Sequence, residues 1–293
     1  RIPPIIMGHE ASGRIEAVGS SVRDWQIGDR VTFDSTIYCN ECDYCRQGMI
    51  NLCSNRRVLG VSCSDYRQDG AFAEYVAVPQ HILFKLPDEV SFRQACLVEP
   101  LSIAFHAVRL SQIDINDTVV VVGAGMIGLL IIQTLRMVGC GELIAVDIDK
   151  KKLELAKYAG ADQCLISDKD KVRDSVLDFT GGKGADASID AVGINASLEA
   201  ALSCLKKGGH ITLVGNLAPT VDLPLQKVVT RQIQIQGSCA SSGEYKACLD
   251  MIARKSIDTD FLISKVASMA EGQKWFNVLY EGKSDLLKVI LEP

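Results

Sequence analysis

Four closely spaced cysteines carry the clearest chemical signal in the sequence: Cys39, Cys42, Cys45 and Cys53. Four thiolates complete a tetrahedral zinc site and leave no position open to a substrate, so this spacing predicts a structural zinc ion. The polar residues between the ligands indicate an exposed lobe. An iron–sulfur cluster also uses four cysteine ligands, and disulfides are a third interpretation, but cysteines this close in sequence would form strained disulfides. We favour zinc.

The other seven of the 11 cysteines show no ligand spacing. Scattered cysteines in a long apolar chain usually act as small buried hydrophobes, and they persist in a reducing compartment. We therefore expect a cytoplasmic protein and packing roles for Cys63, Cys96, Cys140, Cys164, Cys204, Cys239 and Cys248.

A glycine-rich turn follows a run of four valines and precedes an amphipathic segment, with glycines at Gly123, Gly125 and Gly128. Such glycines permit a tight turn, a close approach to a pyrophosphate and close packing of helix and strand. The next apolar run ends at Asp147, whose carboxylate can bind the ribose hydroxyls of NAD and repel the 2′-phosphate of NADP. Lys152 could flank the same ribose. The alternative is that Asp147 caps a helix and Lys152 is a solvated surface charge.

His9 stands directly before Glu10, which places an imidazole beside a carboxylate. Both groups are good zinc ligands. A single histidine next to a glutamate is nevertheless structural in most proteins, so this pair alone does not establish a metal site.

The periodicity of apolar residues predicts two kinds of architecture. Residues 1–104 contain short alternating runs typical of the strands of a small barrel. Residues 105–242 alternate buried strands with helices, which indicates βαβ units and a parallel sheet. The predicted strands are residues 118–122, 143–146, 187–190, 211–214 and 288–291, and the predicted helices are residues 129–138, 150–158 and 245–253.

Length and charge narrow the class of protein. A chain of 293 residues is long for a single core and suits two domains. The net charge of −5 argues against nucleic acid as a partner. No apolar run reaches the roughly 18–20 residues that cross a bilayer, so we expect no membrane partner, and the first residues carry no signal peptide.

The segment that begins Gly8-His9-Glu10-Ala-Ser-Gly, the cysteine lobe, the run Gly70-Ala-Phe-Ala-Glu-Tyr and the glycine turn occur in one order along the chain. This order resembles the medium-chain zinc alcohol dehydrogenases. Val98-Glu99-Pro100-Leu101 is similar to the branch that contains polyol (sorbitol or galactitol-phosphate), threonine and butanediol dehydrogenases.

The resemblance implies an α/β protein. A GroES-like, β-rich catalytic domain would occupy residues 1–104, with its zinc lobe at about residues 39–53. A doubly wound parallel sheet of the Rossmann type would occupy residues 105–242, and residues 243–293 would return to the catalytic domain.

The resemblance also implies a catalytic zinc ion held by His9, by Glu10 or Glu99, and by a cysteine. Three protein ligands leave the fourth position to the substrate. The family has its cysteine a couple of dozen residues before the position of His9, so we expect that the sequence is truncated at its start.

Further coenzyme contacts follow from the resemblance. Ile127 would face the pyrophosphate. A strand-end segment would pair with the carboxamide of the nicotinamide, and a second segment would line the edge of its ring. These segments are Val214, Gly215 and Asn216, and Ser238, Cys239 and Ala240. Sorbitol dehydrogenases of animals have an arginine near Ala240, so that substrate contact is not carried over. His106 and His210 are interpreted as structural.

The expected activity is the reversible, zinc-dependent oxidation by NAD of a secondary alcohol of a polyol or sugar alcohol, either free or phosphorylated. Threonine 3-dehydrogenase and butanediol dehydrogenase are alternatives within the family. A non-catalytic nucleotide-binding protein and a zinc-lobe interaction module are alternatives of a different class. The family is dimeric or tetrameric, so a homo-oligomer is expected.

Overall fold

The computed structural model describes residues 4–61, 67–167, 169–282 and 285–293. The chain divides into two compact units. Unit 1 contains residues 1–102 and 241–293, and unit 2 contains residues 103–240. Helix α3 (Val98–Leu110) crosses the division between them.

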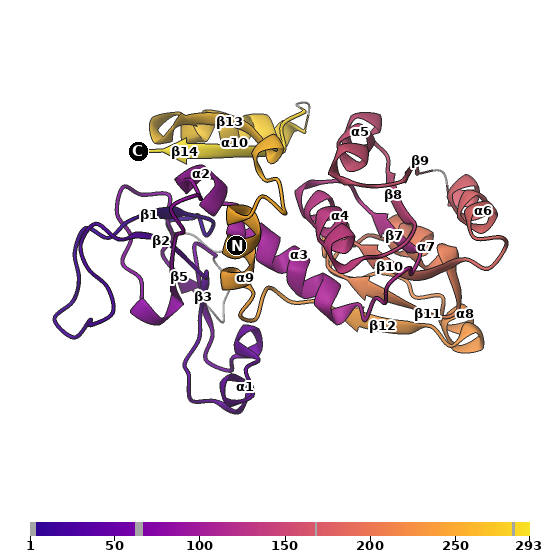
Figure 1. The fold of residues 1–293 in the computed structure, drawn as a ribbon, viewed down its shortest axis with the longest axis horizontal. Helices are drawn as coiled ribbons and strands as arrows, with labels where there is room; N and C mark the ends of the chain where they lie inside the picture. The colour runs from indigo at the N-terminus through magenta and orange to yellow at the C-terminus, as the bar shows by residue number, and fades with distance from the viewer. Residues whose placement is uncertain (1–3, 62–66, 168, 283–284) are drawn as a thin grey trace. The chain divides into compact units, whose positions relative to one another are not determined.

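Unit 1 contains short strands joined by loops and short helices (Figure 1). One sheet has the antiparallel order β1-β2-β6, a second has the order β3-β4-β5, and β13 pairs with β14 in parallel. The strands are β1 (Ser12–Arg14), β2 (Arg30–Phe33), β3 (Thr36–Ile37), β4 (Arg57–Leu59), β5 (Arg67–Gln68), β6 (Leu83–Lys85), β13 (Ile263–Ser268) and β14 (Lys288–Glu292). A small apolar core joins the first two sheets and contains Phe33, Ile37, Leu59 and Ile82.

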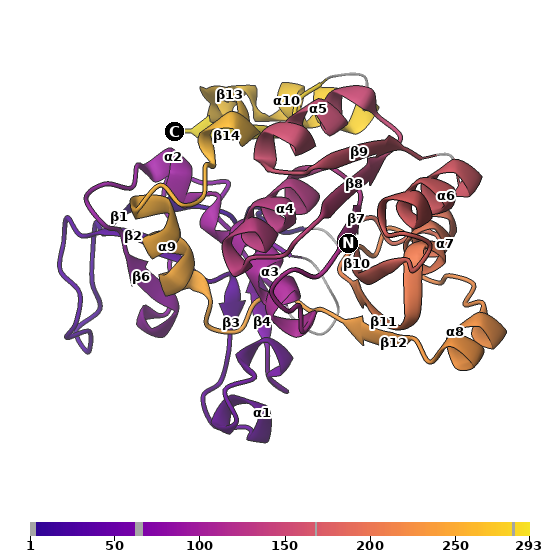
Figure 2. The ribbon, with the colours of Figure 1, turned by 45° about the vertical axis from the view of Figure 1, so that its right-hand side comes forward.

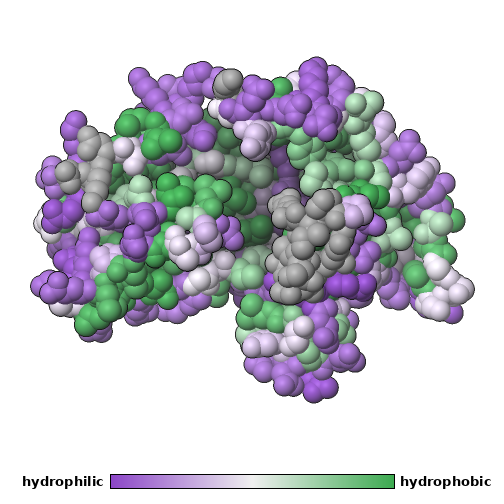
Figure 3. Space-filling view, turned by 180° about the vertical axis from the view of Figure 1, so that it is seen from behind, coloured by the Kyte–Doolittle hydropathy of each residue, from purple (hydrophilic) through white to green (hydrophobic). Residues whose placement is uncertain are grey.

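The helices of unit 1 are short. They are α1 (Asp43–Arg46), α2 (Phe92–Ala95), α9 (Tyr245–Ala253) and α10 (Gly272–Glu281), with 3₁₀ turns η1 (Ile50–Leu52), η2 (Gln80–Ile82), η3 (Asp260–Leu262) and η4 (Met269–Glu271). The lobe that carries α1 projects from the rest of unit 1 in both ribbon views. Hydrophilic residues cover its tip in the space-filling view (Figure 3), in agreement with its polar sequence.

Unit 2 contains a parallel sheet with the strand order β12-β11-β10-β7-β8-β9. Its strands are β7 (Val119–Val122), β8 (Leu143–Asp147), β9 (Gln163–Ile166), β10 (Ala185–Asp190), β11 (Leu205–Leu213) and β12 (Gln234–Gly237). Its helices are α4 (Met126–Val138), α5 (Lys150–Ala159), α6 (Lys169–Phe179), α7 (Asn195–Cys204) and α8 (Leu225–Arg231). Figures 1 and 2 show that these helices cover both faces of the sheet.

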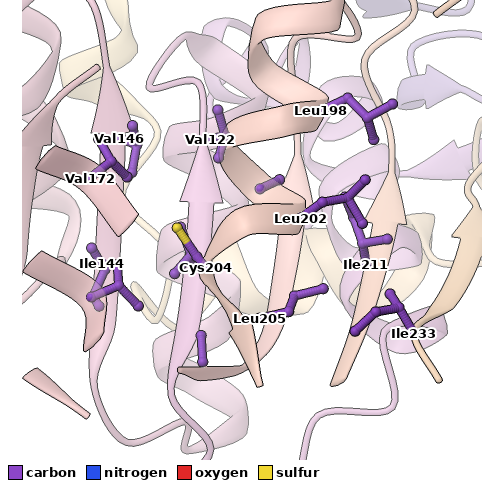
Figure 4. Packing of buried hydrophobic residues seen from close by; sticks show 14 residues of the cluster. Val122, Ile144, Val146, Val172, Leu198, Leu202, Cys204, Leu205, Ile211 and Ile233 are labelled. Atoms are coloured by element: carbon purple, nitrogen blue, oxygen red, sulfur yellow. The ribbon is translucent and has the colours of Figure 1, made fainter. Parts of the chain in front are cut away.

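The central strands of the sheet are apolar on both faces, and helices cover both faces. All residues of β7 and β8 are buried, as expected for strands of a parallel sheet. Helices α6 and α7 pack on one face, where Val172 and Leu202 lie in one cluster with Val122 and Ile144 (Figure 4). Helices α4 and α5 pack against each other and against β8.

Local signals mark the ends of helices α4 and α5. The caps of α4 and α5 at their carboxyl ends are Gly139 and Gly160, with φ of 86° and 117°. This left-handed conformation is easily reached only by glycine. At its start, α5 is capped by Asp149, whose side chain accepts a hydrogen bond from the N–H of Lys151.

The strands and helices predicted from periodicity are confirmed at β7, β8, β10, β11, β14, α4, α5 and α9. Periodicity does not predict the remaining strands and α-helices of residues 105–293, which are β9, β12, β13, α6, α7, α8 and α10. Among the described residues, no helix combines the length and apolar character that crossing a bilayer requires.

Candidate active site

The structure brings His9, Glu10 and Glu99 together in unit 1. His9 Nε2 lies 3.9 Å from Glu10 Oε1 and 4.0 Å from Glu99 Oε1. An imidazole nitrogen of His9 and one carboxylate oxygen from each glutamate all lie within 4.8 Å of one another. His9 and Glu10 lie in the loop before β1, and Glu99 lies in the first turn of α3.

Glycines hold the loop of His9 in place. Gly8 has φ of 99°, and its carbonyl oxygen accepts a hydrogen bond from Ala71 N–H at 2.8 Å. A Cβ atom on Gly60 would lie 2.2 Å from that oxygen, and a Cβ atom on Gly70 would lie 2.1 Å from it. The backbone at these three positions is therefore in direct contact, and no side chain fits between them.

Glu99 is positioned by a buried helix start. Leu97, Val98 and Leu101 are fully buried, so the first turn of α3 cannot rotate without exposing them. Burial raises the pKa of Glu99 to about 8, and the nearby Asp34 carboxylate adds to this rise. A nearby cation would favour the charged form of such a carboxylate.

Glu10 has a cationic partner that the sequence did not suggest. The ammonium group of Lys288, in β14, forms an ion pair with Glu10. The side chains of both residues are less than one-fifth exposed. Burial lowers the pKa of Lys288 to about 8.

The four lobe cysteines form a second cluster in unit 1. Their sulfur atoms all lie within 4.8 Å of one another. Cys39 Sγ is 4.0 Å from Cys45 Sγ and 3.5 Å from Cys53 Sγ. Thiolates around a tetrahedral zinc ion are separated by roughly 3.8 Å, whereas disulfide sulfurs are bonded at about 2 Å. The spacing therefore fits a tetrahedral ion and excludes disulfides within the lobe.

Backbone N–H groups of the lobe favour thiolates. Hydrogen bonds from Cys45 and Ser54 lower the pKa of Cys42 to about 6. Cys53 Sγ accepts hydrogen bonds from the N–H groups of Cys39 at 3.3 Å and Asn55 at 3.4 Å. Burial has the opposite effect on Cys45 and raises its pKa to about 12.

In unit 2, the glycine turn joins β7 to α4. Gly123 has φ of 97°, and a Cβ atom on Gly128 would lie 1.8 Å from the Gly123 carbonyl oxygen. Gly125 is the N-cap of α4 and faces open space. The turn therefore packs tightly inside and leaves the start of α4 open, as binding a pyrophosphate requires.

Asp147 ends β8 and is largely buried. Its Oδ2 accepts a hydrogen bond from Ala124 N–H at 2.6 Å, and its Oδ1 accepts one from Asp149 N–H at 2.9 Å. Asp147 thus contacts the glycine turn itself, while Asp149 is the cap of α5. The interpretation of Asp147 as only a helix cap does not hold.

The other predicted coenzyme segments follow β11 and β12. The N–H of Ser238 donates a hydrogen bond to Leu213 O at 2.9 Å, which joins the ends of these two strands. Ala240 has φ of 50°, unusual for a residue other than glycine. Because the carboxyl ends of parallel strands meet at one edge, all predicted coenzyme segments lie along the same edge of the sheet.

Comparisons with known proteins decide the family. The model of the alcohol dehydrogenase GroES-like domain matches residues 1–88, and that of the zinc-binding dehydrogenases matches residues 127–254. The chain is 30% identical to a sorbitol dehydrogenase of Bacillus subtilis over 99% of this chain and 81% of that protein. It is 32% identical to a D-arabitol-phosphate dehydrogenase of Enterococcus avium over 99% of this chain and 82% of that protein.

A solved structure gives the same result for the fold. A zinc-binding dehydrogenase of Sinorhizobium meliloti bound to NADP superposes with a TM-score of 0.88, at 30% identity, over 100% of this chain and 84% of that chain. The chain belongs to the zinc-dependent medium-chain dehydrogenase family. It is an oxidoreductase, and the predicted GroES-like and Rossmann folds are confirmed.

Zinc and a nicotinamide nucleotide are the cofactors of this family, and the residues present fit both. Ligands around tetrahedral zinc lie roughly 3.4 Å apart, so the separations at His9 need a shift of about half an ångström. At the coenzyme edge, Ser238 Oγ is buried and has no hydrogen-bond partner among the described residues. An orphaned hydroxyl of this kind fits a ligand with polar groups.

Two findings differ from the predictions made from sequence: the exposure of Cys239 and the ion pair of Lys288 with Glu10. Cys239 is exposed, so its interpretation as a packing residue is wrong, whereas Cys140, Cys204 and Cys248 are buried. Cys63 lies outside the described residues. Lys288 was missed because nothing near it in sequence indicates a partner in the loop of His9.

Proposed function

We propose that this protein catalyses the reversible oxidation of a secondary hydroxyl group of a polyol or sugar alcohol by NAD. The observation that carries the proposal is the cluster of His9, Glu10 and Glu99 in a chain that also has a complete glycine turn. Both sorbitol and D-arabitol-phosphate dehydrogenases are relatives of the chain, which favours a polyol over threonine or butanediol.

His9 and one of the two carboxylates would hold the catalytic zinc. Zinc, when bound, supplies a Lewis acid that favours loss of the proton from the substrate hydroxyl. Lys288 neutralises Glu10, whereas among the described residues Glu99 forms an ion pair with His9 alone. Its burial keeps competing water away from this side of the cluster.

The lobe of Cys39, Cys42, Cys45 and Cys53 would hold the structural zinc. All four sulfur atoms are needed for a closed tetrahedron, so the lobe offers no open position to a substrate. Its role in the proposal is therefore stability of unit 1.

The coenzyme assignment rests on unit 2. The glycine turn and Ile127 at the start of α4 would bind the pyrophosphate. Asp147 would bind the adenosine ribose, and its negative charge favours NAD over NADP. Lys152, in the first turns of α5, would flank that ribose. NAD, when bound, would supply the hydride acceptor. The residues that would orient its nicotinamide are Val214, Gly215, Asn216, Ser238, Cys239 and Ala240.

The proposal also includes a compartment and an assembly state. None of the ten cysteines within the described ranges takes part in a disulfide, which favours the cytoplasm. Strand β12 pairs only with β11 among the described strands, and its residues are exposed. An open strand edge of this kind favours a homo-oligomer, dimeric or tetrameric.

The test combines metal analysis with a substrate panel. We expect two zinc equivalents per chain and formation of NADH, measured at its absorbance band, with sorbitol, xylitol or a hexitol phosphate. Activity confined to threonine or 2,3-butanediol would replace the polyol assignment. One zinc equivalent and no turnover with any secondary alcohol would identify a non-catalytic nucleotide-binding protein and overturn the proposal.

A further inference from the structure

Asp190 lies at the carboxyl end of β10, between β7 and β11, and is 1% exposed. Its Oδ1 accepts hydrogen bonds from the N–H groups of Val192 at 2.9 Å and Gly193 at 3.1 Å. Its Oδ2 accepts one from Ser197 Oγ at 3.0 Å. Burial raises the pKa of Asp190, and the hydrogen bonds from these three residues oppose the rise.

The main chain of Asp190 orders a second loop. Its carbonyl oxygen accepts hydrogen bonds from the N–H groups of Val214 at 2.9 Å and Gly215 at 3.0 Å. One buried residue thus fixes both the turn that follows β10 and the segment that follows β11. The second of these contains the residues assigned above to the nicotinamide carboxamide.

The two loops also touch each other and the glycine turn. A Cβ atom on Gly193, which has φ of 78°, would lie 2.1 Å from Gly215 O. A Cβ atom on Gly215 would lie 2.3 Å from the backbone of Val192, and one on Gly123 would lie 2.6 Å from Val192 Cγ2. Val192 therefore lies between the glycine turn and the segment after β11.

We propose that Asp190 is a positioning residue for the nicotinamide half of the coenzyme. Its carboxylate fixes the turn of residues 191–197, so that Val192 sets the spacing between the glycine turn and residues 214–216. The inference rests on the proposed function, because that function assigns these two segments to the coenzyme. The hydrogen bonds described for the Asp190 carboxylate join it to Val192, Gly193 and Ser197. None of these residues belongs to the metal cluster or to the glycine turn.

The test compares two ligands that differ in the nicotinamide. In the Asp190→Asn variant, an amide N–H₂ replaces the oxygen that accepts from Ser197. We expect the Kd of NADH to rise about tenfold and that of ADP-ribose, which lacks nicotinamide, by less than about twofold. Both are measured by calorimetry on the purified protein, together with zinc content, which should not change.

Asp186→Asn is the matched control, because Asp186 lies in the same strand and pairs with Lys206 instead. It should leave both dissociation constants unchanged. Ser197→Ala removes one donor to Asp190 and should reproduce the selective loss on a smaller scale. This variant keeps the test decisive if Asp190→Asn does not fold.

Equal weakening of NADH and ADP-ribose, or unchanged NADH binding with a lower Tm, would reduce Asp190 to a structural residue and overturn the inference. These outcomes leave the proposed function intact. Absence of NADH binding to the unmodified protein would instead refute the coenzyme assignment, and the inference with it. Lack of turnover with every alcohol does not affect the comparison.

Discussion

His9 Nε2 lies 4.0 Å from Glu99 Oε1, although the two residues come from a loop before the first strand and from the start of α3. The pairing depends on the folding of unit 1 as a whole. It gives the cluster an imidazole and a buried carboxylate, which are the ligand types of a catalytic zinc ion.

His9→Ala should remove the zinc of this cluster and leave that of the cysteine lobe. We expect zinc content to fall from two equivalents to one, and turnover to fall by at least about 100-fold, since even outer partners of metal ligands cost about 10- to 100-fold. Mass spectrometry of bound metal and a steady-state assay check this. Full activity with one zinc equivalent would disprove the role of His9.

Glu99 gives the metal-free protein a distinctive dependence on pH. Burial raises the pKa of Glu99 from 4.5 to about 8 in the folded state, so the unfolded state loses its proton first. Stability of the metal-free protein should therefore decrease as pH rises from about 4.5 to about 8. Zinc reverses this by favouring the carboxylate, so the gain in Tm on adding zinc should grow with pH. Glu99→Gln, which cannot ionise, should flatten both trends in thermal melts.

Asp147→Ala should reduce coenzyme selectivity. Loss of the carboxylate that accepts hydrogen bonds from the ribose hydroxyls should lower kcat/KM for NAD by about 10- to 100-fold and change that for NADP less. Asp149→Ala is the matched control: it removes the cap of α5 at a cost of about 1 kcal/mol in stability, with selectivity unchanged. If both variants keep the preference for NAD, the ribose assignment fails.

Cys42→Ser should act on stability more than on chemistry. Without one of four ligands the lobe should release its zinc, and Tm should fall while the remaining zinc still supports turnover. Cys164→Ser, outside the lobe, should keep both zinc equivalents. A collapse of the rate at unchanged Tm would show that the lobe serves catalysis.

Lys288→Met tests the buried pair with Glu10. Removing one partner of a buried ion pair costs about 3–5 kcal/mol, because the other charge stays buried without compensation. Arg93→Met is a matched control, since Arg93 pairs with Glu292 on the surface, where both side chains are about half exposed; it should cost less than about 1 kcal/mol. Urea denaturation of both variants measures the difference, and equal costs would contradict a buried pair.

The parts predictable from sequence are those encoded locally. The cysteine spacing and the glycine turn each lie within one short segment, so their geometry depends little on the rest of the chain. Helices cover both faces of the sheet, so β7 and the first four residues of β8 are uniformly apolar, and this also is visible in sequence. Strand β12, with no buried residue, carries no such pattern and was not predicted.

The parts that could not be predicted depend on contacts between distant segments. The resemblance alone associated Glu99 with His9, and nothing associated Lys288 with Glu10. The role of Asp149 as the cap of α5 could have been recognised from its position before Lys150, but Asp147 was the more conspicuous acid. The contacts of Asp190 depend on the register of three strands, which no local pattern specifies.

The contact among Gly8, Gly60 and Gly70 limits how this protein can be engineered. Replacing any one of them by alanine would push apart the segments that carry and support His9, without altering a single ligand. Harmful variants should therefore be common at these positions, and libraries aimed at new substrates gain by holding all three constant.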